Sequence, residues 1–195
     1  PKDAEVNETA QSEQASPNIT LLPASKWSSE DFLTMFCFDG PNQWFIAASL
    51  ALALHKSLLM QLINLDEEHF RKTGIVKFNI YQYGTWQKVV VDDKLPADSD
   101  QLVFTKPQGA GRTAFWLPLL EKAYAKLYGS FEAMATHGSL ASALTDLTGG
   151  GSVQTVQIES SSHSDLIGKE LSAKSLVLVR TKVCLLIRET KIHKY

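Results

Sequence analysis

Residues 40–48 read Gly40-Pro41-Asn42-Gln43-Trp44-Phe45-Ile46-Ala47-Ala48, and the charge-free apolar run that they open continues to Leu54. Gly-Pro turns the chain and Asn is a residue type that caps helices, so this stretch predicts a helix start. The apolar residues fall on adjacent stripes and cover much of the helix circumference. We therefore expect a central, buried helix around which the remaining elements pack.

Composition predicts a globular chain and excludes several classes of partner. With 195 residues, 44% of them hydrophobic, the chain can bury one substantial core. The net charge of -2 and the pI near 6.2 give no electrostatic reason to bind nucleic acid or an anionic membrane surface. The apolar run ends at His55 and Lys56, short of the roughly 20 residues of a membrane span. We expect no transmembrane segment.

The two cysteines, Cys37 and Cys184, are too few for a disulfide framework or a cysteine-based zinc site. This indicates a reducing compartment, and we expect a cytoplasmic protein. Four of the five histidines, His55, His69, His137 and His163, have no metal-ligand spacing and are interpreted as surface or helix-end residues.

The chain divides into three parts. Residues 1–18 are predicted to be a flexible tail, because residues 1–16 contain Val6 as their only large aliphatic side chain. Residues 19–151 form the first subdomain, in which a lead-in from Ile19 to Asp39 packs on the rest. Residues 152–195 form the incomplete start of a second subdomain, after the turning segment 148–152.

Alternating apolar residues predict a hairpin from the strands Ile75 to Tyr81 and Trp86 to Val91, with Gly84 between them. A turn follows at 92–98, then a short strand from Gln101 to Thr105. Phe115 to Tyr128 has helical spacing, with Pro118 tolerable only in the first turn and Gly129 as a stop.

The last third carries weaker patterns. A short helix is expected from Leu140 to Leu147, and a second from Asp165 to Ala173. Val153 to Ile158 alternates as a strand does, and Leu176 to Ile187 is an apolar strand candidate. Trp44, Trp86 and Trp116 are interpreted as core aromatics.

Three long segments of the sequence resemble the protease core of the calpain family. They are Tyr83-Gly84-Thr85-Trp86-Gln87-Lys88-Val89-Val90-Val91-Asp92-Asp93-Lys94-Leu95-Pro96, Phe115-Trp116-Leu117-Pro118-Leu119-Leu120-Glu121-Lys122-Ala123-Tyr124-Ala125-Lys126 and Leu144-Thr145-Asp146-Leu147-Thr148-Gly149-Gly150. They occur in the family's order, within a resemblance that covers roughly Trp27 to Gly151. The resemblance implies an α+β, papain-like calpain core: a helical first subdomain with a central buried helix and a small antiparallel sheet, plus the β-rich start of the second.

The resemblance also implies a site. In calpains a Cys in the motif Gly-Asp-Cys-Trp-Phe is the nucleophile, at a helix N-terminus whose field lowers its thiol pKa. The matching run here is Pro41-Asn42-Gln43-Trp44-Phe45, so Gln43 occupies the nucleophile position. A carboxamide has no ionisable thiol, and we expect no acyl transfer from it.

The other catalytic positions are altered as well. Cys37, six residues before Gln43, stands where the family has the Gln that stabilises the oxyanion. It could have taken over as nucleophile, but it lies outside the helix terminus, and we favour a small apolar residue beside Phe36 and Phe38. His193 resembles the family's catalytic His, the alternative being a solvated tail residue. The orienting Asn has no counterpart before Tyr195.

Calpain cores also bind calcium. The family's Glu ligand matches Ala114, and its Asp ligand, nine residues before the nucleophile position, matches Thr34. Neither side chain carries a carboxylate, so we expect no calcium activation here, the alternative being weak binding through backbone carbonyls alone. The acidic residues Asp92, Asp93, Asp98 and Asp100 are interpreted as a solvated turn in preference to a calcium site.

Two functions follow. The first is a calpain-like module without peptidase activity that binds or regulates a protein partner through the former substrate cleft. The second is an active calcium-dependent cysteine endopeptidase whose nucleophile has been altered. Family members that lack catalytic residues include proteins of the cytoskeleton, and such an association is a further expectation from the resemblance.

Overall fold

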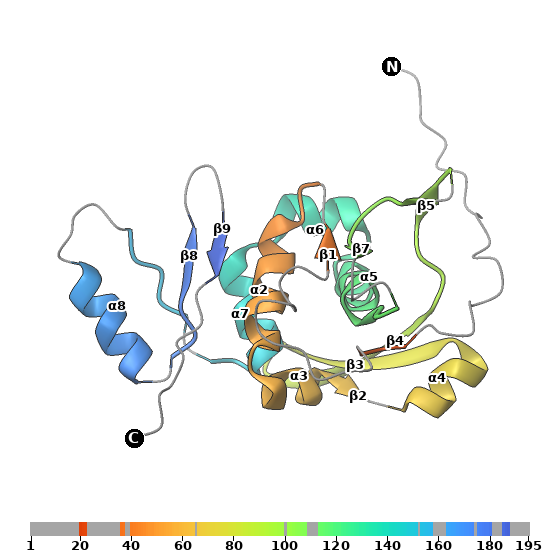
Figure 1. Ribbon diagram of the computed structural model, residues 1–195, viewed down its shortest axis with the longest axis horizontal. Helices are drawn as coiled ribbons and strands as arrows, with labels where there is room; N and C mark the ends of the chain where they lie inside the picture. The colour runs from red at the N-terminus through yellow and green to blue at the C-terminus, as the bar shows by residue number, and fades with distance from the viewer. Residues whose placement is uncertain are drawn as a thin grey trace, which may run out of the picture.

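The computed structural model describes residues 20–22, 36–37, 40–64, 66–99, 101–108, 113–151, 153–157, 163–173, 175–180 and 185–187. The predicted tail lies outside these residues, as does most of the lead-in. The fold is α+β, as predicted, with helices packed beside a small antiparallel sheet (Figure 1).

Helix α2 (Gln43–Ala53) is the central buried helix that the sequence predicts. Residues Phe45 to Ala53 are all buried, because their apolar side chains meet neighbouring elements on every side. The helix contacts α5 (Trp116–Tyr128) and α7 (Leu140–Thr148) and lies between them (Figure 1). Only its first turn reaches the surface.

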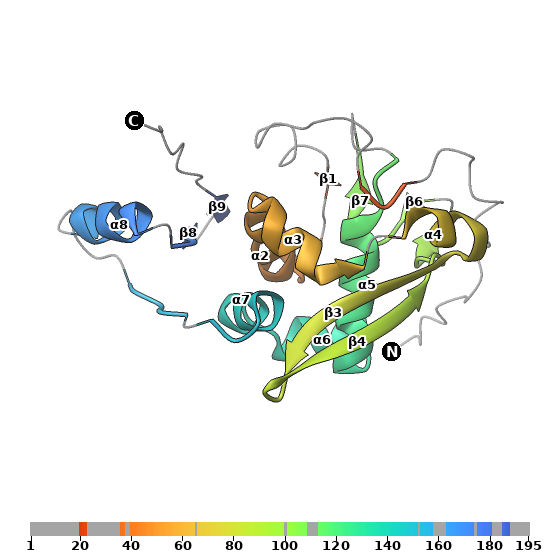
Figure 2. The ribbon, with the colours of Figure 1, turned by 90° about the horizontal axis from the view of Figure 1, so that it is seen from below.

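The sheet has the order β2-β3-β4 and is antiparallel throughout. Its strands are β2 (Ile63–Asn64), β3 (Ile75–Gln82) and β4 (Thr85–Asp92), and the turn Tyr83-Gly84 joins the last two at φ values of 51° and 80°. One face is apolar and buried, and Figure 2 shows α5 behind the hairpin and α7 beside its turn end. Its side chains are Val76, Phe78, Ile80, Val89 and Val91.

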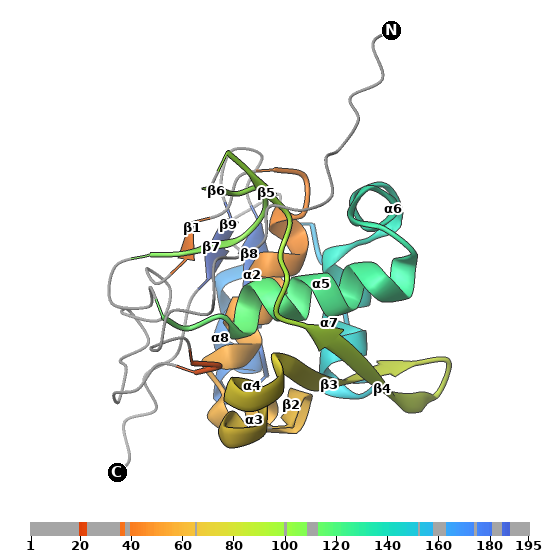
Figure 3. The same cartoon turned by 90° about the vertical axis from the view of Figure 1, so that its right-hand side faces the viewer.

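Helix α5 crosses the middle of the molecule (Figure 3). Pro118 lies in its first turn, where a missing N–H breaks no helical hydrogen bond, and Gly129 ends it at a φ of 97°. The main-chain N–H groups of Phe115 and Trp116 donate to the carbonyls of Thr20 and Leu21. The described part of the lead-in therefore packs on the domain, as predicted.

Three short helices were not predicted. They are α3 (Lys56–Leu62), α4 (Glu67–Thr73) and α6 (Phe131–His137). Asp66 and Ser130 cap the second and third, so the signals were single capping residues before short, mixed segments. Within the described residues no single helix is long and apolar enough to cross a membrane; α2 and α3 qualify only as a pair, bent by 119°.

Short strand pairs complete the first part. β1 (Phe36–Cys37) pairs with β7 (Lys106–Pro107), and β5 (Ala97–Asp98) pairs with β6 (Gln101–Leu102). The strand expected at 101–105 is thus shorter and begins with β6. Leu95 and Pro96 before β5, and Leu102 of β6, line the same small hollow as Glu121 of α5.

The last part contains α8 (His163–Ser172) and the hairpin of β8 (Leu178–Arg180) and β9 (Leu185–Ile187). The helix prediction is confirmed, and the apolar run 176–187 contains two short strands. The strand predicted from Val153 to Ile158 was wrong for the described residues 153–157, which form no strand. Gln154 to Gln157 are exposed, so alternation alone had no buried face to stabilise it.

Candidate functional site

Gln43 is the first residue of α2, and its side chain is exposed. Gly40 and Pro41 before it are exposed as well, and we call these three residues the Gln43 face. Asn42 occupies the N-cap position, as predicted, but its side chain makes no capping hydrogen bond. The amide that matches the family nucleophile therefore lies at the surface, at the positive end of a buried helix.

A buried polar cluster lies directly behind this face. Asn42 Nδ2 donates to Glu121 Oε1 at 3.2 Å, and the main-chain N–H of Thr105 donates to Glu121 Oε2 at 3.2 Å. All three residues are almost completely buried. Burial raises the pKa of Glu121, and hydrogen bonds from Thr105 and Asn42 oppose the rise. The cluster joins the start of α2 to α5 and to the segment before β7.

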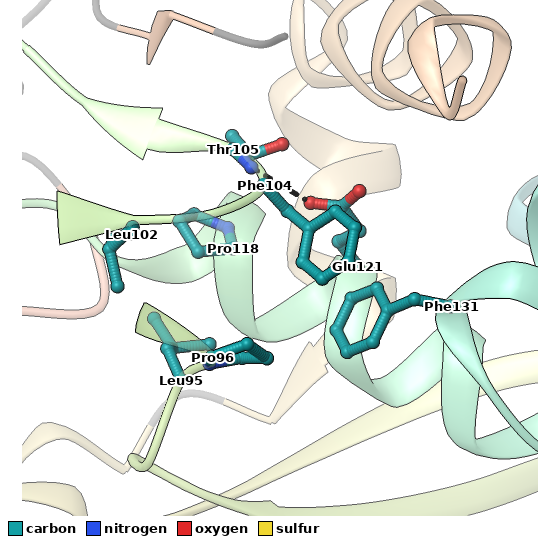
Figure 4. Close-up of a pocket in the computed structure, with 8 residues that line it drawn as sticks. All are labelled: Leu95, Pro96, Leu102, Phe104, Thr105, Pro118, Glu121 and Phe131. Carbon is teal, nitrogen blue, oxygen red and sulfur yellow. Dashed lines mark hydrogen bonds between the residues drawn. The ribbon is translucent and has the colours of Figure 1, made fainter. Parts of the chain in front are cut away.

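Glu121 also lines a small hollow beside α5, which Figure 4 shows. The rings of Phe104 and Phe131 stack there, with centroids 4.1 Å apart and planes 8° apart. The remaining lining residues are Leu95, Pro96, Leu102, Thr105 and Pro118. The open space is that of about one water molecule, so this hollow is too small for an organic ligand.

The residues after Gln43 anchor the site to the core. Trp44 and Phe45 pack against Tyr124 with ring centroids 6.1 and 4.4 Å away. Trp44 also lies so close to Gly138 that a Cβ there would overlap its ring. Trp44 and Trp116 thus pack in the core, but the same prediction was wrong for Trp86, which is 45% exposed and lies beside the turn of the hairpin.

The structure describes only some of the predicted site residues. Cys37 lies in β1, where its main chain pairs with Lys106, and its side chain is not among those described. His193 and Thr34 lie outside the described residues, so their positions relative to Gln43 stay predictions. His55, His69 and His137 are exposed at or near helix ends, which confirms their interpretation as surface residues.

The described residue at the family's calcium position, Ala114, offers no side-chain oxygen. Ala114 is fully buried and forms a bridge with Thr20, so a methyl group fills the place of a carboxylate ligand. Among the residues with described structure, no group of three or more His, Cys, Asp or Glu could hold a metal ion. Asp92 bonds instead to Lys122, which lowers its carboxyl pKa, and Asp98 accepts from the Ser99 hydroxyl. Asp100 lies outside the described residues.

Sequence reasoning missed Glu121 as part of the site. A signal existed, because the residues three and four positions away on α5 are Leu117, Pro118, Tyr124 and Ala125, all of them buried. A carboxylate on such a stripe needs buried donors. Which donors it finds was not readable, because Asn42 lies 79 positions away in the sequence.

Comparison with known proteins identifies the family. The model of the "Calpain family cysteine protease" matches residues 40–190, beyond the end of the resemblance at Gly151. Human Calpain-12 is 40% identical over 139 residues, which are 70% of this chain and 19% of that protein. Human Calpain-14 is 38% identical over 148 residues, 69% of this chain and 21% of that protein.

Calpain clp-1 of Caenorhabditis elegans is 41% identical over 108 residues, which are 55% of this chain and 14% of that protein. The chain spans about a fifth or less of the length of these relatives. The family model covers most of the chain, and the buried helix, the hairpin and α5 fold as the resemblance implies. The chain therefore belongs to the calpain family of cysteine proteases.

Proposed function

We propose that this chain is a calpain-like domain that does not cleave peptide bonds and that binds an unfolded polypeptide segment through the Gln43 face. The observation that carries the proposal is the position of Gln43, exposed at the first residue of α2, where the family motif has cysteine. A neutral amide cannot form the thiolate that attacks a peptide carbonyl. Without a thiolate at residue 43, the nucleophilic attack that begins peptide cleavage cannot take place.

The packing around Gln43 supports the proposal that the Gln43 face is a binding surface. Trp44 and Phe45 pack on Tyr124, and Asn42 donates a hydrogen bond to Glu121. The replacement has removed the reactive group but has left the helix start ordered and exposed. Binding without turnover uses these features, because recognition needs a fixed surface and no nucleophile.

Peptidase activity is tested with casein in the presence of calcium, beside a purified active calpain. We expect hydrolysis by the calpain and none by this chain. A thiol-directed epoxide gives the matched measurement. Both proteins carry Cys37→Ser and Cys184→Ser, so that no other thiol can react. We expect the epoxide to label residue 43 in the protein that also carries Gln43→Cys, and to leave the protein with Gln43 unlabelled. The proposal is contradicted if the unmodified chain hydrolyses casein and the epoxide blocks this hydrolysis. That result favours the active endopeptidase.

Binding is tested with fluorescently labelled, unfolded casein as the polypeptide. We expect Gln43→Glu to weaken binding at least tenfold, because the carboxylate adds a charge and its hydration to the contact. Glu is tolerated at a helix N-terminus, so the fold is retained. Gln61→Glu, at an exposed position of α3, is the control with the same change of charge. Equal affinities of the two variants exclude the Gln43 face as the binding surface.

A further inference from the structure

Asn42 stands at the N-cap of α2, but it does not use its side chain as caps usually do. An N-cap Asn normally accepts a hydrogen bond from a main-chain N–H of the first turn. Here Oδ1 is buried and has no hydrogen-bond partner among the described residues, whereas Nδ2 donates to Glu121. The carbonyl of Asn42 accepts from Phe45 and Ile46 at 2.9 and 3.2 Å. The residue before Gln43 is therefore fixed at both ends, by α2 and by α5.

Glu121 is the buried group that holds this side chain. Its residue is 2% exposed, and its second oxygen accepts from Thr105, as Figure 4 shows. A buried carboxyl is costly unless donors surround it, so the bonds to Asn42 and Thr105 are what make this position tolerable. No side chain in the described part of the protein donates to Oδ1 of Asn42.

We infer that Glu121 is a positioning residue for the Gln43 face: it holds the Asn42 side chain away from the α2 cap and so sets where residue 43 lies. That the Gln43 face binds a polypeptide rests on the proposed function. The test of the Glu121 inference does not depend on it. Loss of the Glu121 bond frees Asn42 to rotate and cap the helix. The geometry of Gln43 then changes, although no contact of its own has been altered.

The protonation of Glu121 gives this coupling a measurable signature. The hollow that Glu121 lines has six apolar neighbours and Thr105, none of which titrates. On its own helix, Lys122 turns away to Asp92, and the hydroxyl of Tyr124 donates to Asp146. A neutral carboxyl accepts hydrogen bonds more weakly than a carboxylate, so Asn42 is held less firmly below the pKa of Glu121.

The test is an NMR pH titration of the whole chain, which follows three signals. They are the Glu121 carboxyl carbon, the Asn42 side-chain amide and the main-chain amide of Gln43. We expect them to move with one midpoint, above the ordinary range of a Glu carboxyl. In Glu121→Gln the pH dependence of the two amides is lost, whereas Glu132→Gln, an exposed position on α6, leaves it in place.

A second variant keeps the inference testable if Glu121→Gln does not fold. In Asn42→Ala the Glu121 carboxyl still titrates, but the Gln43 amide no longer follows it. The inference is overturned if the Gln43 amide keeps the Glu121 midpoint in either variant, or never shows it in the parent. Since the titration needs no bound polypeptide, failure of casein binding removes the proposed function and leaves this result standing.

Discussion

The hydroxyl of Tyr124 donates a 2.7 Å hydrogen bond to Oδ2 of Asp146, which ties the middle of α5 to the last turn of α7. Tyr124 is fully buried, and its ring also packs on Phe45 and Trp44 of α2. One side chain of α5 therefore contacts both α2 and α7. Burial raises the pKa of Asp146, and the bonds from Tyr124 and Gln82 oppose the rise.

Tyr124→Phe removes this hydroxyl and keeps the ring. We expect a loss of about 1 kcal/mol in the free energy of unfolding, because the partly buried Asp146 carboxylate loses a donor. The pKa of Asp146 should rise further, since the bond that opposed the effect of burial is gone. Urea unfolding and an NMR titration of Asp146 measure both effects. Tyr83→Phe is the control, because Tyr83 is 96% exposed, and it should change neither quantity.

Gly149→Ala tests the close approach of the hairpin to the end of α7. A Cβ at Gly149 would lie 2.5 Å from Cζ2 of Trp86, and the residue has a φ of 88°. We expect a loss of at least about 1 kcal/mol from the left-handed backbone alone, and a shift of Trp86 fluorescence as the ring is displaced. In Gly168→Ala, a helical glycine with open space, stability should be unchanged or higher. An unperturbed Trp86 spectrum in Gly149→Ala contradicts the close contact between residue 149 and the indole ring.

The stability of the chain should carry a signature of Glu121 in its pH dependence. Because burial raises the folded-state pKa of Glu121 above the unfolded value of about 4.3, the folded state keeps its proton when the unfolded state has lost it. This contribution favours folding below the unfolded pKa and is lost as the pH rises through the folded pKa.

The measurement compares the unfolding free energies of the parent and of Glu121→Gln from pH 4 to pH 7. The difference, parent minus variant, should fall as the pH rises. A difference that stays constant over this range contradicts the raised pKa. Glu132→Gln supplies the control for the loss of a carboxylate on an exposed helix surface.

Lys122→Met tests the link between α5 and the end of β4. Lys122 Nζ donates to Asp92 Oδ1, to the Asp92 carbonyl and to the Lys94 carbonyl. The bond from Lys122 is the main cause of the lowered pKa of Asp92. We expect that pKa to return toward its ordinary value in Lys122→Met, as measured by NMR titration.

The stability that Asp92 supplies is present above its unfolded pKa and is lost as the pH falls through its folded pKa. Lys122→Met should therefore flatten this part of the acid unfolding curve. Lys126→Met is the matched control, because Lys126 donates to the Val90 carbonyl. It should leave the Asp92 titration in place, and an equal effect of both variants would show that general charge, not the Lys122 bond, sets that pKa.

Local patterns in the sequence were enough for the elements with a long, regular signal. The helix from Gln43, the hairpin around Gly84 and the helix from Trp116 were all predicted, because each has a continuous apolar period and a clear terminator. Short helices such as α4 depend on a few capping bonds, and strands such as β1 exist only through a distant partner, Lys106–Pro107. Their signal lies in contacts and not in the local sequence.

The candidate site divides in the same way. The sequence alone determined that residue 43 carries an amide, and the resemblance to the family motif predicts from the sequence that this is the nucleophile position. Only the tertiary structure decided that Asn42 leaves the helix cap for Glu121, and that Trp86 lies partly exposed against Gly149. The sequence gives the chemical type of every side chain directly. The partner of a buried donor depends instead on how segments that are distant in the sequence pack together.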